Sequence, residues 1–221
     1  MVMNKEYFQT LQNQESYGKK NQIFLKKRVL KTFLKLINVF LNKDVQKNSF
    51  ILDLGTADGT FVEVVENNGF KSLGLDINEI NLETDKIDLE NETCDVITAN
   101  SLIEHIKNPD NLMKESKRLL KKDGVLILVT PDWAQNFKNF YDDPTHVKPY
   151  TKKSLEFLLK SYGFENVKIV PWLVCKPTWM WKIPFNFLLA RLIPFRGNSG
   201  RLIPGFLKGK SKTLLAICSK S

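Results

Sequence analysis

A glycine-containing turn at residues 55–59 directly follows an apolar run. The run Phe50–Leu54 fits a buried strand, and Phe61–Val65 resumes the apolar pattern as the start of a helix. Gly55 and Gly59 lack a Cβ and reach positive φ at little cost, so the turn can approach a ligand closely. The helix start offers free N–H groups to the same ligand. This arrangement predicts a small-molecule site, although an ordinary strand-to-helix turn has the same outline.

An acidic residue follows the next strand. The stretch Lys71–Asp76 fits a short strand that ends in a carboxylate, about 20 residues beyond Gly55. In nucleoside-binding α/β folds, a carboxylate at this position accepts hydrogen bonds from the ribose hydroxyls. The two signals together favour a ligand that contains a nucleoside. The alternative is an aspartate that only caps the following turn.

These residues need a sheet to position them, and the chain alternates strand and helix patterns. Further strands are predicted at Lys86–Leu89, where the pattern is weak, and at Cys94–Ala99, Val125–Thr130, Phe164–Val174 and Thr213–Cys218. Helices are predicted at Asn21–Leu41, from Asp110 onward and at Lys152–Tyr162, and Lys121–Gly124 is predicted as a turn. The alternation predicts an α/β fold with a parallel sheet covered on both faces. The first helix is basic and amphipathic. Such a helix could lie on a membrane, but packing of its apolar face on the sheet is the commoner use and is favoured.

Four stretches in this order resemble the successive motifs of class I S-adenosylmethionine-dependent methyltransferases. They are Asp53–Gly59, Gly74–Asp76, Cys94–Ile97 with Leu102–Ile106, and Arg118–Ile127. The resemblance covers roughly residues 50–170. It implies a Rossmann-like, doubly wound and mostly parallel sheet with an antiparallel last strand, and S-adenosyl-L-methionine as the cofactor. A nicotinamide dehydrogenase is disfavoured, because Ala57 and Thr60 stand where its second and third glycines would be.

The resemblance also implies a set of cofactor-binding residues. Asp53 would orient the methionine end, the turn would pass beneath the cofactor, and Asp76 would hold the ribose. Asp88 and Leu89 match the region beside the adenine, and Asn100 and Ser101 the loop nearest the methyl group. The full set is Asp53, Gly55, Thr56, Ala57, Asp58, Gly59, Asp76, Ile77, Asp88, Leu89, Asn100 and Ser101. Ala57 departs from the family pattern, which has a glycine there.

Two histidines are the candidates for catalysis. A sulfonium is already an activated methyl donor, so the protein mainly aligns the acceptor, and a base is needed when the acceptor is a hydroxyl. His146 lies in a loop after a predicted strand, which in this fold reaches over the cofactor, and it is our first candidate for the base or for a group that positions the acceptor. His105 is the second candidate. The alternatives are that His146 fixes its own loop and that His105, with Glu104, completes the fold.

No metal site and no disulfide framework are predicted. Asp142 and Asp143 could bind a metal, but no third ligand is evident and solvated loop acids are commoner. Cys94, Cys175 and Cys218 are far apart and form no CxxC pair, which fits a reducing cytoplasm. The first residues lack the layout of a signal peptide, and no apolar run approaches the roughly 20 residues of a spanning helix.

The net charge of +9 is concentrated near the C-terminus. From Asn166 onward there are ten of the 33 basic residues and none of the 24 acidic ones. Residues 176–212 add the aromatic side chains of Trp179, Trp181, Phe185, Phe187, Phe195 and Phe206, with prolines that limit any helix to Phe185–Leu192. This mixture suits a contact with an anionic membrane, or a pocket for an anionic or lipid-linked acceptor. A lid whose aromatic side chains complete the core is the alternative, and nucleic acid is disfavoured because no RNA-binding module is present.

A second resemblance concerns the acceptor. The pattern of His146–Thr151, Leu155–Leu159 and Tyr162–Phe164 is similar to methyltransferases of bacterial polysaccharide and lipid-linked sugar pathways. We therefore expect methyl transfer to an oxygen of a saccharide or lipid-linked acceptor, in the cytoplasm or at the membrane periphery. A methyltransferase for nucleic acid or another small molecule remains open, as does a catalytically silent cofactor-binding or membrane-attached protein. Residues 1–48 are expected to form a helical region on the sheet, and 49–221 the methyltransferase domain with an insertion at 176–212.

Overall fold

The computed structural model describes residues 18–173, 188, 192–193 and 211–221. Most of the predicted insertion at 176–212, with its predicted helix Phe185–Leu192, lies outside these residues. Among the described residues, no helix combines the length and the hydropathy needed to cross a bilayer.

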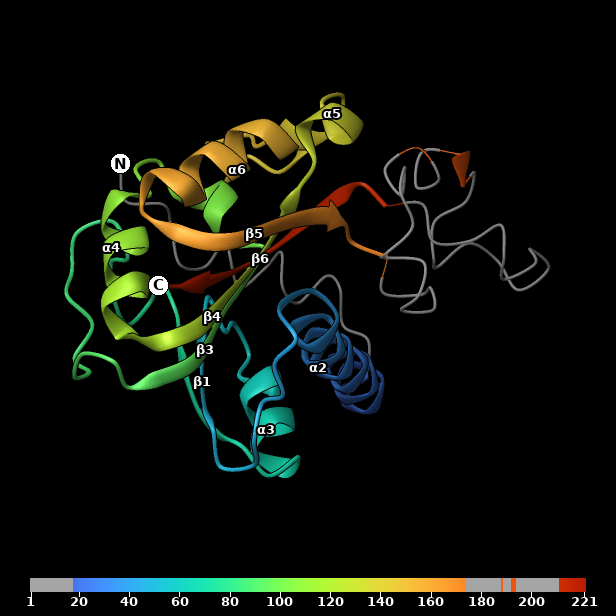
Figure 1. Ribbon diagram of the computed structural model, residues 1–221. Coiled ribbons are helices and arrows are strands. Elements are labelled where there is room, and N and C mark those ends of the chain that lie inside the picture. The colour runs from blue at the N-terminus through green and yellow to red at the C-terminus, as the bar shows by residue number, and fades with distance from the viewer. Residues whose placement is uncertain (1–17, 174–187, 189–191, 194–210) are drawn as a thin grey trace.

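Six strands form one mixed sheet (Figure 1). They are β1 (Phe50–Leu54), β2 (Lys71–Leu75), β3 (Cys94–Asn100), β4 (Leu120–Pro131), β5 (Phe164–Pro171) and β6 (Thr213–Lys220). Their order is β2-β1-β3-β4-β6-β5. The first four are parallel, and β6 inserts between β4 and β5, antiparallel to both. The predicted Rossmann-like sheet with an antiparallel last strand is confirmed.

Helices cover both faces of this sheet, as Figure 1 shows. The first face carries α2 (Lys19–Leu41) and α3 (Thr60–Asn67), and the other carries α4 (Asp110–Leu119) and α6 (Lys152–Ser161). Alternate residues of each central strand contribute to the two cores: Ile127 packs with α2 and α3, whereas Leu126 packs with α4 and α6. A strand directs successive side chains to opposite faces, so a strand covered on both sides must be apolar throughout.

The α2 helix buries a narrow apolar stripe against the sheet. Leu30, Phe33, Leu36 and Ile37 are buried at helical spacing, and this contact supports packing on the sheet as the role of the helix. Asn42 ends α2 in a left-handed conformation, with φ of 53°.

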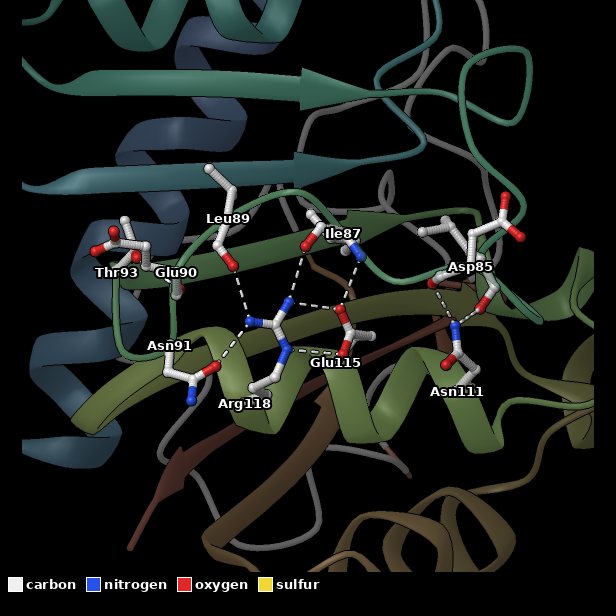
Figure 2. A network of polar contacts seen from close by, with 10 residues as sticks. Asp85, Ile87, Leu89, Glu90, Asn91, Thr93, Asn111, Glu115 and Arg118 are labelled. Carbon is white, nitrogen blue, oxygen red and sulfur yellow. Dashed lines mark hydrogen bonds and ion pairs between the residues drawn. The ribbon is translucent and has the colours of Figure 1, made fainter.

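Two local predictions were wrong. Residues 86–89 form no strand, because their backbone groups bond to side chains of α4: the Ile87 N–H donates to Glu115 Oε2 (2.8 Å), and the Ile87 and Leu89 carbonyls accept from Arg118 (Figure 2). Residues 121–124 lie inside β4 instead of forming a separate turn. The pairing jumps there from Cys94 with Leu120 to Val96 with Val125, so these residues form a bulge.

Short segments complete the carboxyl edge of the parallel strands. The 3₁₀ turn η1 (Ile103–His105) follows β3, and α5 (Trp133–Asn136) and η2 (Phe140–Asp142) follow β4. Because β3 and β4 are parallel neighbours, these segments begin at the same edge of the sheet.

Candidate active site

The turn after β1 adopts the left-handed backbone that its glycines predict. Gly55 and Gly59 have φ of 76° and 71°. Ala57, which replaces the family's glycine, also has a positive φ of 54°, at a conformational cost of about 1 kcal/mol. A Cβ at Gly55 would lie 3.1 Å from Leu102 Cδ1, so Gly55 also permits close packing after β3.

Hydrogen bonds tie this turn to the end of β2. The N–H of Gly55 donates to the Leu75 carbonyl (2.7 Å), and the N–H of Ala57 donates to Asp76 Oδ2 (3.0 Å). Gly74 leaves room for the turn, because a Cβ there would lie 2.6 Å from Thr56 Oγ1. The structure therefore brings the glycine turn and Asp76 together.

Asp53 is a buried carboxylate at the base of the turn. It is 5% exposed, and its Oδ1 accepts a hydrogen bond from Thr98 Oγ1 on β3 (2.7 Å). Burial raises the pKa of Asp53 from 3.8 to about 6, although the Thr98 hydrogen bond and the positive charge of Lys26 act in the opposite direction. Such a group gains from a cation that replaces the lost water.

A small cavity lies above Asp53 at the carboxyl end of β1. Its volume is about 20 Å³, and it is lined by Asp53, Gly55 and Asn100 together with Phe61 of α3 and with Lys26, Val29 and Phe33 of α2. A nucleoside needs far more space, because ligand pockets usually measure about 300 Å³ or more. The cavity is therefore too small to enclose a nucleoside.

The remaining predicted cofactor residues fall into two groups. Asp58 Oδ1 accepts from the Thr60 N–H (3.0 Å) at the start of α3, Ile77 is 46% exposed, and the Ser101 N–H donates to the Val129 carbonyl (2.8 Å). These three stay near the carboxyl ends of the strands.

Asp88 and Leu89 lie elsewhere. They line a separate cavity of about 490 Å³, which is also lined by Arg118 and by Thr93, the residue that directly precedes β3. The structure therefore does not bring them together with Asp53 and the glycine turn.

The two histidines lie next to each other, with ring centroids 4.8 Å apart. His105 comes from η1 and His146 from the loop after η2. The loop is held against η1 because the Glu104 carbonyl accepts from the N–H groups of Val147 (2.9 Å) and Lys148 (3.0 Å). Backbone pairing thus brings together two residues that are far apart in the sequence.

Each histidine has its Nδ1 atom directed at a carbonyl oxygen. His146 Nδ1 lies 2.6 Å from the Phe140 carbonyl, and His105 Nδ1 lies 3.1 Å from the Thr145 carbonyl. A carbonyl only accepts, so Nδ1 carries the proton and the neutral rings have their lone pairs on Nε2. Burial lowers the pKa of His105, and the neighbouring His146 acts in the same direction.

Two carboxylates accompany the histidines. Glu104 is fully buried, and its Oε2 accepts from Thr130 Oγ1 of β4 (2.9 Å), while its Oε1 has no hydrogen-bond partner among the residues that the structure describes. Burial raises the pKa of Glu104 from 4.5 to about 7. Asp143 Oδ2 lies 3.8 Å from His146 Nε2. Burial opposes ionisation of Asp143, but hydrogen bonds from Thr145 hold its pKa below the usual value.

Comparison with known proteins decides the family. The model of a family described as "Methyltransferase domain" matches residues 24–169, which is more than half of the chain. The chain belongs to the methyltransferase-domain family. This membership makes S-adenosylmethionine the cofactor of the domain.

Individual relatives of this methyltransferase domain are distant. A ubiquinone biosynthesis O-methyltransferase of Pelagibacter ubique is 26% identical over 125 residues, which are 48% of this chain and 50% of that protein. The chain spans half or less of the length of the curated relatives it matches.

Two solved structures share the fold. A methyltransferase from Archaeoglobus fulgidus has a TM-score of 0.55 at 20% identity, covering 88% of this chain and 94% of that one. Phosphoethanolamine N-methyltransferase 2 of Haemonchus contortus, in complex with S-adenosylmethionine, has a TM-score of 0.54 at 14% identity, covering 85% and 51%.

Several residues of the candidate site were not singled out from the sequence. Thr98 bonds to Asp53, Lys26 lines the same cavity, and Thr145 fixes His105. Lys26 was detectable, because it shares a helical face with Val29 and Phe33 at spacings of three and seven. Thr98 and Thr145 give no such signal, because their roles depend on contacts between distant segments.

Proposed function

We propose that this domain transfers the methyl group of S-adenosylmethionine to an oxygen of a saccharide or lipid-linked acceptor. When bound, the cofactor supplies a methyl group activated by its sulfonium. The chain has to hold the two reactants in line, exclude water and take up the hydroxyl proton.

The cofactor-binding part of this proposal rests on the fit of the residues at β1 and β2. The buried carboxylate of Asp53 suits an ammonium group, and Asp76 offers two carboxylate oxygens to ribose hydroxyls. The Asp76 oxygens now accept from the Ala57 N–H and from Asn78 Nδ2. The ribose hydroxyls of a bound cofactor would donate hydrogen bonds to the Asp76 oxygens in place of these two groups.

One observation carries the catalytic part, namely the orientation of His146. Its Nδ1 donates to the Phe140 carbonyl at 2.6 Å, so the lone pair of the neutral ring is on Nε2 and can accept a proton from a hydroxyl. His146 follows β4, whose neighbour β3 ends beside the glycine turn through Asn100. In open α/β sheets ligands bind outside the carboxyl ends of the strands, which supports an acceptor at this place.

The acceptor class is supported by sequence features and by the names of similar proteins. The ubiquinone relative is named an O-methyltransferase, which is consistent with an oxygen acceptor. The phosphoethanolamine neighbour is named an N-methyltransferase, so nitrogen acceptors occur on this fold. The basic and aromatic residues of 176–212, and the similarity of residues 146–164 to polysaccharide-pathway enzymes, favour the saccharide or lipid-linked class.

The proposal is tested with the variant His146→Ala. We expect transfer from labelled S-adenosylmethionine to a lipid-linked saccharide fraction to fall by about 10² to 10⁴, the usual contribution of a general base. Cofactor affinity, measured by calorimetry, should stay within about twofold, because the cofactor residues belong to other segments.

Lys148→Ala is the matched control from the same loop, and it should retain activity. Unchanged turnover in His146→Ala would dismiss its catalytic role. Transfer to nucleic acid but not to saccharides would replace the acceptor class, and absence of cofactor binding would leave only a catalytically silent protein.

A further inference from the structure

Glu104, His105 and His146 form a compact group of metal-ligand types. One ligand atom from each residue lies within 4.8 Å of those of the other two. The chain contains only two histidines, and both belong to this group. From the sequence no metal site is predicted, because Asp142 and Asp143 lack an evident third ligand, whereas the fold brings together a different set of residues.

The histidines are oriented as metal-binding histidines usually are. In metal sites, a ligating imidazole commonly donates its other N–H to a carbonyl or carboxylate, which fixes the ring and directs the lone pair at the ion. Nδ1 of both His105 and His146 is committed to a backbone carbonyl. In addition, Thr145 Oγ1 lies 2.8 Å from His105 Nδ1 and donates to Asp143 Oδ1 at 2.6 Å.

Glu104 supplies a second, independent observation. Its side chain is fully buried, and Oε2 accepts from Thr130, but Oε1 is buried without a hydrogen-bond partner in the described part of the chain. A buried carboxylate oxygen without a partner is destabilising, because its lost hydration is not replaced. A cation at this point removes that destabilisation.

We propose that Glu104, His105 and His146 bind one divalent transition-metal ion. Two imidazoles and one carboxylate match the ligand set of catalytic zinc sites, which keep a further position open for water or substrate. Nitrogen ligands favour Zn²⁺ or Co²⁺ over Mg²⁺ and Ca²⁺. Tetrahedral ligand atoms about 2.1 Å from an ion lie about 3.4 Å apart. The three ligand atoms, which now lie within 4.8 Å of one another, must therefore approach each other by about an ångström. The partly exposed rings can supply this movement.

The role of the ion rests on the proposed function. An ion on Nε2 occupies the lone pair that would otherwise accept a proton, so His146 becomes a ligand in the loaded enzyme. The acceptor hydroxyl binds at the open position and releases its proton to water, because the ion lowers its pKa. The resulting oxygen bonds to the methyl carbon as the carbon–sulfur bond breaks, and the electron pair stays on sulfur.

Metal binding is measured without cofactor or acceptor, on chelator-treated protein that carries no histidine tag. Titration with Co²⁺, followed by visible absorption, should saturate at one equivalent with the intense bands of low coordination, and Zn²⁺ should abolish them. His146→Ala and Glu104→Gln should each weaken binding at least tenfold. Glu104→Gln is the safer variant for folding, because an amide oxygen can still accept from Thr130.

Asp142→Asn is the control, since it removes a neighbouring carboxylate outside the group. Circular dichroism melts establish that each variant is folded. Absence of a saturable spectrum, or equal binding by folded His146→Ala and the native chain, overturns the proposal. Calorimetry with S-adenosylmethionine on the same samples keeps the outcomes apart, because cofactor binding without cobalt binding removes the metal site and leaves the methyltransferase function.

Discussion

At the residue scale, burial disfavours the ionised form of Asp53, and a bound cation would stabilise that form. The folded-state pKa of about 6 lies above the ordinary 3.8, so the folded chain holds this proton more tightly than the unfolded chain. The corresponding stabilisation is present below pH 3.8 and is lost as the pH rises through 6. At neutral pH the ionised form therefore costs up to about 3 kcal/mol. The ammonium group of the cofactor is suited to offset it.

This titration makes cofactor affinity pH-dependent. We expect the affinity for S-adenosylmethionine to fall about tenfold for each pH unit below 6, because a neutral carboxyl cannot pair with an ammonium group. Asp53→Asn should bind weakly at every pH, while the cofactor-free variant should melt at a higher temperature near pH 7. Calorimetry between pH 5 and 8 measures the first effect. Equal affinity of the native protein at pH 5 and pH 7.5 would contradict this assignment.

At the element scale, a side-chain network replaces a strand. Arg118 donates to the Ile87 carbonyl (2.9 Å), the Leu89 carbonyl (2.8 Å) and Asn91 Oδ1 (2.9 Å), and it forms an ion pair with Glu115 (2.6 Å; Figure 2). Glu115 in turn accepts from the Ile87 N–H. The pKa of Glu115 is lowered mainly by its hydrogen bond with Arg118. The α4 helix thus fixes the segment between β2 and β3.

Loss of this network should lower stability. Arg118→Met should reduce the free energy of unfolding by about 2–3 kcal/mol, because it removes the cation beside the buried Glu115 carboxylate, which keeps only the Ile87 N–H among the donors that the structure describes, and leaves two carbonyls without their donor. Urea unfolding measures the loss. Lys114→Met is the control on the same helix, since it breaks only the exposed pair with Asp110 and should change stability by less than about 1 kcal/mol. Equal effects of the two substitutions would contradict a special role for Arg118.

The sequence was informative where a pattern is local, and it was uninformative where contacts join distant segments. β1, β3 and β4 are apolar because both of their faces are covered, so their patterns predicted them. Residues 86–89 show a weak strand pattern around the apolar Ile87, which is buried in the structure. Their backbone groups nevertheless bond to side chains of α4. The glycine turn and Asp76 were predictable because their spacing is local. The contact between His105 and His146 was not, because it depends on hydrogen bonds from Val147 and Lys148 to a distant carbonyl.

At the scale of the whole molecule, charge is distributed unevenly along the chain. The excess of basic over acidic residues comes from the part after Asn166, and most of residues 176–212 lie outside the described structure. The association of this part with a membrane therefore stays a prediction. We expect co-sedimentation with anionic liposomes at low salt, which decreases as salt screens the charges.

Neutral liposomes are the control and should bind much less. A protein that stays in the supernatant with anionic liposomes at low salt would remove the membrane hypothesis. It would leave the acceptor pocket and the lid as the roles for the basic and aromatic residues.

The antiparallel insertion of β6 has one more consequence. The Pro171–Leu214 pairing and the hydrogen bond from the Trp172 N–H to the Thr213 carbonyl (2.8 Å) hold the two ends of residues 174–210 side by side. A connection between adjacent antiparallel strands needs only a few residues, and each tenfold shortening of a loop lowers its closure entropy cost by about 2 kcal/mol. The stability of the sheet therefore depends only weakly on the length of this segment. A change in the length or sequence of this segment should therefore leave the methyl-donor half of the molecule intact.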